Sequence, residues 1–203
     1  MKTEDFKNIE NQVNELEKLS SIEFVPVFAK QSESYCLIRF LWAIAFALSS
    51  AYSLNQLWIS PMLFYGIPIG VGFFVYFFIF KVPFLFDLFT LDRSVLRSIE
   101  RAAKEEFLKH EVFATQDRTG VLIYISNLER KVYVFADKGL ATKTKDSEWT
   151  ELGAELAKTL GDSKNVAHTF SQALTQISKK HAADFPPKSE NPNELENKPR
   201  TRH

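Results

Sequence analysis

The longest uncharged stretch of the sequence constrains the fold most. From Phe40 to Phe80 there is no Asp, Glu, Lys, Arg or His, although charged residues are dense elsewhere. Ile59-Ser60-Pro61 interrupts the stretch near its middle and predicts a tight turn between two apolar helices. Phe40–Trp58 and Met62–Phe80 have nineteen residues each, close to the roughly 20 that cross a bilayer. The stretch therefore predicts a transmembrane helical hairpin inserted into a soluble protein.

The flanks of the stretch predict how such a hairpin would be oriented. Arg39 and Lys81 lie at its two ends, which a hairpin brings to the same side, and Trp42, Trp58 and Tyr76 lie near the ends, where aromatic rings prefer the headgroup layer. All 25 basic residues lie outside the stretch, so the positive-inside rule predicts that both termini are cytoplasmic. The alternative is a buried helical hairpin in a soluble core, although core helices of this length usually keep a polar stripe.

Composition narrows the function classes. The chain has 25 basic and 25 acidic residues, whereas nucleic-acid-binding proteins normally carry a basic excess, so we expect no nucleic-acid partner. Cys36 is the single cysteine, which excludes an internal disulfide and fits a reducing compartment. The four histidines show no ligand spacing with one another or with the cysteine, so we expect no structural zinc site.

The periodicity predicts an α/β domain that the hairpin interrupts. Residues 1–36 predict a helix and a first strand, with Pro26 indicating an edge or bulged strand, and Glu23 in this strand is expected to face solvent. Residues 37–81 form the predicted hairpin and residues 82–91 an interfacial elbow. Residues 92–184 predict helices around two strands, and the polar composition of residues 185–203 predicts a disordered tail.

The two later strands, 120–126 and 131–136, are separated by a four-residue turn and predict an antiparallel hairpin. If the turn is centred between Leu128 and Glu129, Gly120 lies opposite Asp137. Four charged residues then gather at one end of the sheet, while Glu129 and Arg130 lie at the other. The four are Asp117, Arg118, Asp137 and Lys138. The two carboxylates, Asp117 and Asp137, and the two cations could hold a divalent cation such as calcium or magnesium, or a phosphate. Solvated loops with ion pairs are the alternative interpretation.

A family resemblance covers most of the chain, from Thr3 to about Ala183. The segment from Asp117 to Gly139, followed by Trp149, resembles the signature of the TPM domain family. Ile22-Glu-Phe-Val-Pro-Val-Phe28 before the apolar stretch is similar to the first strand of one branch, that of uncharacterised bacterial membrane proteins with an inserted pair of transmembrane helices. The resemblance implies a small α/β/α sandwich and a bacterial inner-membrane location. Some relatives are described as acid phosphatases or photosystem repair factors, and some bind calcium.

Two classes of function remain open at the level of sequence. The first is a non-catalytic module tethered to the cytoplasmic face of the membrane, which binds membrane or cytoplasmic proteins or helps membrane complexes assemble. The second is a metal-assisted phosphatase that acts at the same face, for which family analogy is the support. The sequence contains no nucleophile elbow, phosphate-binding loop or strong metal motif.

Overall fold

The structure is a computed structural model that describes residues 3–55, 57, 60–78, 85–86, 88, 90, 92–162, 166–187, 195 and 199–202. The chain divides into two compact units. The first joins Met1–Ser32 to Arg97–His203, and the second is Glu33–Leu96. The apolar stretch is thus an insertion in a domain that continues on both sides of it in sequence, as the periodicity predicts.

The first unit is a mixed α/β domain. Its strands are β1 (Glu23–Ala29), β2 (Gly120–Ser126), β3 (Lys131–Ala136) and β4 (Arg200–Arg202). Its helices are α1 (Thr3–Glu17), most of α5 (Asp92–Lys109), the 3-10 turn η2 (Val112–Ala114), α6 (Lys138–Ala141), α7 (Asp146–Asp162) and α8 (Val166–His181). The strand order is β3-β2-β1-β4. β1 pairs in parallel with β2 and with β4, and β2 pairs antiparallel with β3.

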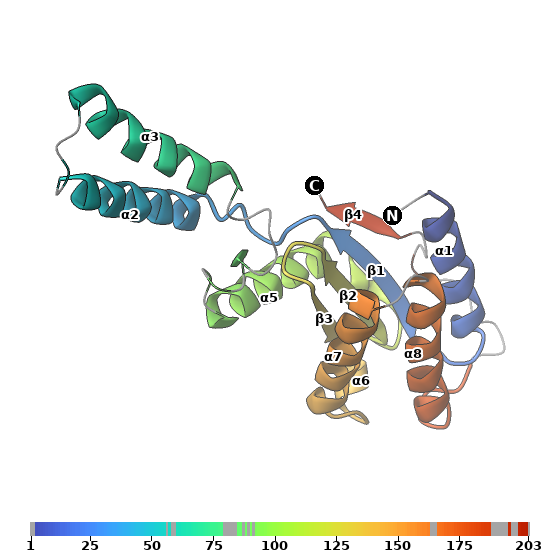
Figure 1. Cartoon of the computed structure of the whole chain (residues 1–203). Helices are drawn as coiled ribbons and strands as arrows, with labels where there is room; N and C mark the ends of the chain where they lie inside the picture. Colours follow the sequence, from blue (N-terminus) through green and yellow to red (C-terminus); the bar gives the residue numbers. More distant parts are fainter. Residues whose placement is uncertain are drawn as a thin grey trace. The chain divides into compact units, whose positions relative to one another are not determined.

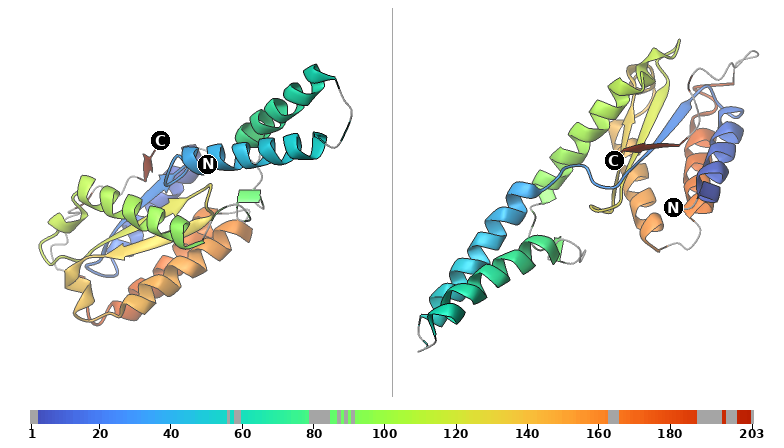
Figure 2. Two further views of the ribbon diagram at one scale, coloured as in Figure 1. Left: turned by 90° about the vertical axis from the view of Figure 1, so that its left-hand side faces the viewer. Right: turned by 90° about the horizontal axis from the view of Figure 1, so that it is seen from above.

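Helices cover both faces of this sheet (Figures 1 and 2). One face packs on α1, α7 and α8, and its core includes Phe24, Ile123, Trp149 and Leu156. α5 lies on the opposite face, where the Phe107 ring meets the Phe135 ring edge-to-face with centroids 4.8 Å apart. Every residue of β2 is buried, as its nearly continuous apolar sequence predicts for a strand covered on both sides.

Pro26 lies in a strand that is not at the edge of the sheet. β1 has a neighbour on each side, so the prediction of an edge strand is wrong for the strand as a whole. The physical reason is local. Glu23 and Ala29 hydrogen-bond toward β2, so the backbone of Pro26, an odd number of residues from each, faces the other way. β4 pairs only with Val27–Ala29, so no neighbouring strand needs the N–H that Pro26 lacks.

The segment after α8 differs from the predicted disordered tail of residues 185–203. Phe185 is buried and its carbonyl accepts a hydrogen bond from the Ser21 N–H at 3.1 Å. Arg200–Arg202 forms β4 on the outer side of β1. Composition is a poor guide here because β4 is short and held by polar contacts rather than by apolar burial. For these residues the prediction is wrong, and most of residues 188–198 lie outside the described part of the chain.

The second unit contains the two apolar helices, α2 (Cys36–Leu54) and α3 (Pro61–Phe78). Both start before the predicted spans. α2 follows Tyr35, which has a positive φ of 53°, and α3 starts at Pro61, whose fixed φ suits the first helical position. Trp58, Ile79 and Phe80, which the predicted spans include, lie outside the described residues.

The two apolar helices pack against each other through small side chains. A methyl group placed on Gly72 would lie 3.3 Å from the carbonyl oxygen of Ala43 and 3.4 Å from the Cβ of Ala47. Ala43 is the buried residue of α2, and Pro68 and Val75 are those of α3. The remaining large side chains of both helices are mostly exposed, with Met62 at 86% and Tyr52 at 74%. Both helices are long and apolar enough to cross a membrane.

Part of the predicted interfacial elbow at residues 82–91 is described. Phe86 is 1% exposed and meets the Tyr35 ring edge-to-face at 5.2 Å, whereas Leu88 is 62% exposed. The Thr90 hydroxyl donates to the Phe86 carbonyl at 2.7 Å. The other residues of the segment, 82–84, 87, 89 and 91, lie outside the described part of the chain.

Candidate functional site

The structure brings together Arg118, Asp137 and Lys138 at one end of the sheet. Val121 pairs with Ala136, and the Asp137 N–H donates to the Gly120 carbonyl at 2.9 Å. Gly120 therefore lies opposite Asp137, in the register that the four-residue turn predicts. Gly120 leaves room for Val112, because a Cβ there would lie 2.1 Å from the Val112 carbonyl oxygen.

Asp137 is engaged by a cation and by a helix end. It is 5% exposed, and the Arg118 guanidinium contacts it through Nε at 2.8 Å from Oδ2 and Nη2 at 3.3 Å from Oδ1. Its Oδ1 also accepts the Lys138 N–H at 2.8 Å, which caps α6. Arg118 adopts a positive φ of 58° and lies over the Phe113 ring at 5.5 Å. Together these contacts hold the loop before β2 against the start of α6.

This end of the sheet does not fit a divalent cation well. Calcium takes six to eight oxygen ligands, yet the Asp137 carboxylate faces a guanidinium. In the described ranges, no three His, Cys, Asp or Glu side chains gather as metal ligands. Asp117 is exposed, and its carbonyl oxygen would lie 2.0 Å from a Cβ on Gly139, so α6 approaches the Asp117 backbone closely. The cation at Asp117 and Asp137 remains a prediction.

Glu129, at the other end of the sheet, is buried instead of lying in a solvated turn. It is 3% exposed. Its Oε1 accepts the Ser32 N–H at 2.7 Å, and its Oε2 accepts the Ser126 hydroxyl. The same turn donates the Asn127 N–H to the Ala29 carbonyl at 3.0 Å. The turn therefore fixes the backbone that follows β1.

A buried tyrosine lies near this carboxylate. Tyr124 is fully buried on the α5 side of β2, and burial raises the pKa of its phenol, with the Ser32 side chain acting in the opposite direction. Glu23, expected to face solvent, is also buried at 3% exposure, where β1 pairs with Gly120 of β2.

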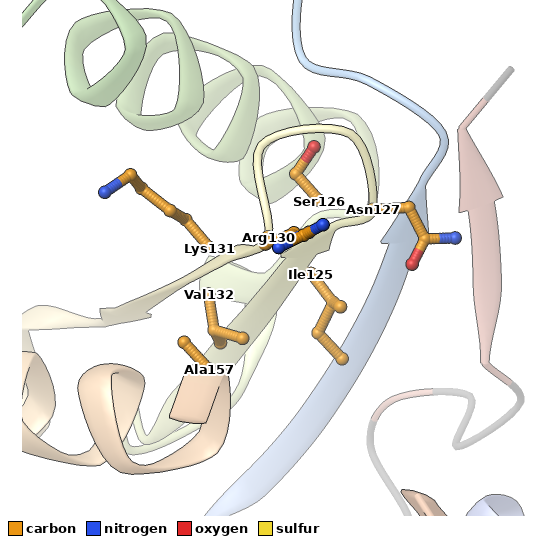
Figure 3. Close-up of a pocket in the computed structure, with 7 residues that line it drawn as sticks. All are labelled: Ile125, Ser126, Asn127, Arg130, Lys131, Val132 and Ala157. Atoms are coloured by element: carbon orange, nitrogen blue, oxygen red, sulfur yellow. The ribbon is translucent and has the colours of Figure 1, made fainter. Parts of the chain in front are cut away.

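A shallow pocket of about 90 Å³ lies beside the same turn. Figure 3 shows Ile125 and Val132 pointing toward Ala157 of α7, while Ser126 and Lys131 point to the other side of the hairpin. Arg130, exposed and with a positive φ of 51°, and Asn127 complete the lining. Ligand pockets usually enclose about 300 Å³ or more, so this one is too small for a substrate of drug size.

A charged cluster that the sequence interpretation missed joins β4 to α5. The Arg202 guanidinium lies 2.8 Å from Glu105 Oε2 and 3.5 Å from Glu106 Oε1, and it donates to the Ala102 carbonyl at 3.2 Å. Glu106 is 3% exposed and its Oε2 lies 2.9 Å from His110 Nε2. This cluster could not be predicted from the sequence, because Arg202 lies in a segment with the composition of a disordered tail.

The electrostatics of this cluster act on His110. Burial, followed by the charge of Arg200, lowers the pKa of the His110 imidazole, although Glu106 acts to raise it. A neutral imidazole is therefore favoured next to β4.

A second histidine, His181, is buried on the opposite face of the sheet. His181 stacks on Trp149 with centroids 6.2 Å apart, and its Nε2 lies 2.9 Å from Glu148 Oε2. Lys180 Nζ lies 2.8 Å from the same oxygen, and its hydrogen bond is the main cause of a lowered pKa at the Glu148 carboxylate. The hydrogen bond with His181 lowers this pKa further. The cluster ties α8 to α7, and Asp184 Oδ2 lies 3.9 Å from His181 Nδ1. Among the described residues, these side chains do not form a group of three metal ligands.

Comparison with known proteins supports the fold. No protein-family model matches the chain, and no curated protein matches it. A solved structure that matches is the NMR structure of the BA42 protein from the psychrophilic bacterium Bizionia argentinensis. It is 16% identical, with a TM-score of 0.61 over 100% of this chain and 95% of that one. At this identity the match shows a shared fold.

Proposed function

We propose that the protein is a TPM-like α/β/α module anchored in a bacterial inner membrane by α2 and α3, and that it binds membrane or cytoplasmic proteins on the cytoplasmic side. The observation that carries the proposal is the surface of these helices. Their large apolar side chains, such as Leu37, Met62 and Phe73, are 63% to 86% exposed. Exposure of an apolar surface of this extent to water is unfavourable, whereas the hydrocarbon core of a bilayer solvates it.

The paired geometry of the two helices supports an anchor of hairpin type. They pack through Ala43, Ala47 and Gly72, and small residues let backbones approach closely where lipid provides no hydrophobic drive between helices. The location of all basic residues outside the apolar stretch supports the proposal that both ends of the hairpin face the cytoplasm.

A binding role accords with the charged residues of the first unit. Arg118 and Asp137 join two segments, Glu129 fixes the backbone after β1, and Arg202 holds β4. Each of these groups has a structural partner. A phosphatase would need charged groups that converge on a substrate, whereas these groups converge on one another and on the protein backbone.

Cysteine labelling tests the anchor and its orientation. Cys36 is exposed at the start of α2 and Asn55 is exposed at its end. In intact cells, a membrane-impermeant maleimide should label Asn55→Cys in a Cys36→Ser background. The natural Cys36 should react only after permeabilisation and serves as the matched control for the cytoplasmic side.

The opposite labelling pattern would overturn the orientation. Extraction of the protein from membranes by alkaline carbonate would overturn the anchor itself. In a third arm, Ala47→Arg should impair insertion, because a central charge costs about 2.5–3.5 kcal/mol on insertion scales.

A further inference from the structure

The outer edge of β1 offers only a short length of backbone for pairing. The Phe24 N–H is already bound by Glu17 Oε1 at 3.2 Å, and Pro26 has no N–H to offer. Beyond them, the Lys30 N–H donates to the Arg202 carbonyl at 3.4 Å. The usable edge therefore runs from about Val27 to Lys30, which is the part that β4 covers.

On the α5 face of the sheet, acidic side chains of α5 lie beside this edge. Arg200 and Arg202 pair with Val27 and Ala29, so both side chains lie on the same face of the sheet, which is the face toward α5. Glu105, Glu106 and the Ala102 carbonyl together receive the Arg202 guanidinium. We call this short edge, with its three α5 acceptors, the edge site.

We propose that the edge site is an acceptor for an extended segment of a protein partner that carries arginine at two alternate positions, and that Arg200–Arg202 of this chain occupies the site in cis. The proposal rests on the function as a binding module and gives the chemistry of its partner. Addition of a strand to a sheet edge is a common mode of peptide recognition, in which backbone hydrogen bonds give affinity and alternate side chains give specificity.

The geometry of the edge site explains why it should prefer arginine to lysine and why a partner segment can displace the cis segment. A planar guanidinium carries five donors spread over three nitrogens in a fixed fork, which suits separate carboxylate and carbonyl acceptors, whereas the three donors of a lysine share a single nitrogen. The cis segment pairs over three residues only, and Glu105 keeps 55% of its side chain exposed. A competing segment can therefore reach the carboxylate that the cis arginine uses.

The test uses the full chain in mild detergent and a fluorescent peptide of residues 195–203. Arg202→Ala in the chain removes the cis guanidinium, so this variant should bind the peptide about tenfold or more tightly than the wild-type chain does, since charge-assisted hydrogen bonds of this kind are worth at least that factor. A peptide with Arg202→Lys should lose most of that affinity. Absence of saturable binding to the Arg202→Ala chain would overturn the proposal.

A matched pair of variants on α5 gives a readout that does not depend on the peptide. Glu105→Gln removes one acceptor of Arg202, whereas Glu100→Gln changes the same residue type on the same helix, where it pairs with Lys104 at 2.6 Å. Glu105→Gln should speed hydrogen exchange of the Lys30 amide, and Glu100→Gln should not. Equal effects of the two variants would contradict the edge site.

The oligomeric state distinguishes binding of a different protein at the edge site from binding of a second copy of this chain. If the wild-type chain forms a dimer that Arg202→Ala dissociates, the edge site exchanges strands between copies, and the proposal of a different partner is wrong. A wild-type chain that stays monomeric while the Arg202→Ala chain binds the peptide supports it. None of these results depends on the cysteine labelling, so failure of the edge site and failure of the membrane anchor are distinguishable.

Discussion

Glu129 is the residue whose environment departs most from its position in a short turn. A charged residue in a four-residue connection normally faces water, yet this carboxylate is 3% exposed and accepts two hydrogen bonds. Those bonds tie the β2–β3 turn to Ser32, on the segment that leads from β1 toward α2. The two hydrogen bonds position the backbone that follows β1.

We expect Glu129→Ala to lower the free energy of unfolding by about 2–3 kcal/mol, because it leaves the buried donors of Ser32 and Ser126 without their acceptor. Hydrogen exchange of the Ser32 amide should quicken in parallel. Arg130→Ala, in the same turn but exposed, is the matched control and should change stability by less than about 0.5 kcal/mol. Similar effects of the two substitutions would show that Glu129 does not hold this segment.

His110 should make the stability of the first unit depend on pH. Its pKa is lowered from the usual 6.5 by burial and by Arg200, against the influence of Glu106, with Lys109 adding to the lowering. The unfolded chain then binds the proton more readily, so stability is highest above pH 6.5 and falls as pH drops toward the lowered pKa. Titration of the His110 ring by NMR, and unfolding between pH 7.5 and 5.5, would check this.

His110→Gln provides the control for that titration, since it removes the ionisable group. The variant should lose the fall in stability that belongs to this residue. A His110 pKa at or above 6.5 would contradict the expectation.

At the residue scale, the sequence predicts those contacts that depend on residues close together in the chain. The turn length predicts Gly120 opposite Asp137, and the register has this pairing, so Arg118 and Asp137 meet as expected. Burial of Glu129 depends on Ser32, which is 97 positions away, and burial of Glu106 depends on Arg202. Long-range pairings of this kind leave no periodic signal in a single sequence.

At the scale of elements, α2 and α3 depend on one close approach. A Cβ on Gly72 would lie only 3.3 Å from the Ala43 carbonyl oxygen, a tight contact, whereas Gly70 and Gly66 have nothing within 4 Å of the position of a Cβ. The periodicity of an all-apolar stretch does not reveal which glycine faces the partner helix, so this distinction comes from the structure alone.

Gly72→Leu should therefore separate the two helices, and Gly70→Leu should be tolerated as the matched control. Thermal unfolding of the chain in mild detergent, followed by circular dichroism, reports on the packing. We expect the midpoint to fall in Gly72→Leu and to stay near the wild-type value in Gly70→Leu. Equal midpoints would mean that the helices do not pack through Gly72.

The strands show why element boundaries were more predictable than element neighbours. β-branched and aromatic content predicts β1, β2 and β3 close to their bounds. The position of β1 between β2 and β4 was not predictable, because β4 has three polar residues and lies in a segment of tail-like composition. Pro26 is compatible with an interior strand only because β4 stops short of it.

At the scale of the whole molecule, the first unit is assembled from segments on both sides of the insertion. β1 pairs with β2 along its full length, from Glu23 with Gly120 to Ala29 with Ser126. We expect a fragment of residues 97–203 to remain unfolded, because it lacks the strand that joins β2 to β4.

A peptide of residues 1–32 added to that fragment should restore a cooperative unfolding transition, and the same peptide with Phe24→Asp should not, because Phe24 is fully buried. Circular dichroism with thermal unfolding would check both. A fragment of 97–203 that unfolds cooperatively alone would contradict the need for β1.

The insertion between β1 and β2 also sets an order of events during synthesis. β2 begins about 90 positions after β1 ends, so at about 5–20 residues per second the first strand waits roughly 5–20 s for its parallel neighbour. Both apolar helices leave the ribosome within that interval and can enter the membrane while the sheet does not yet exist. During the wait, Pro26 interrupts an apolar β-prone segment and hinders its pairing with strands of other nascent chains.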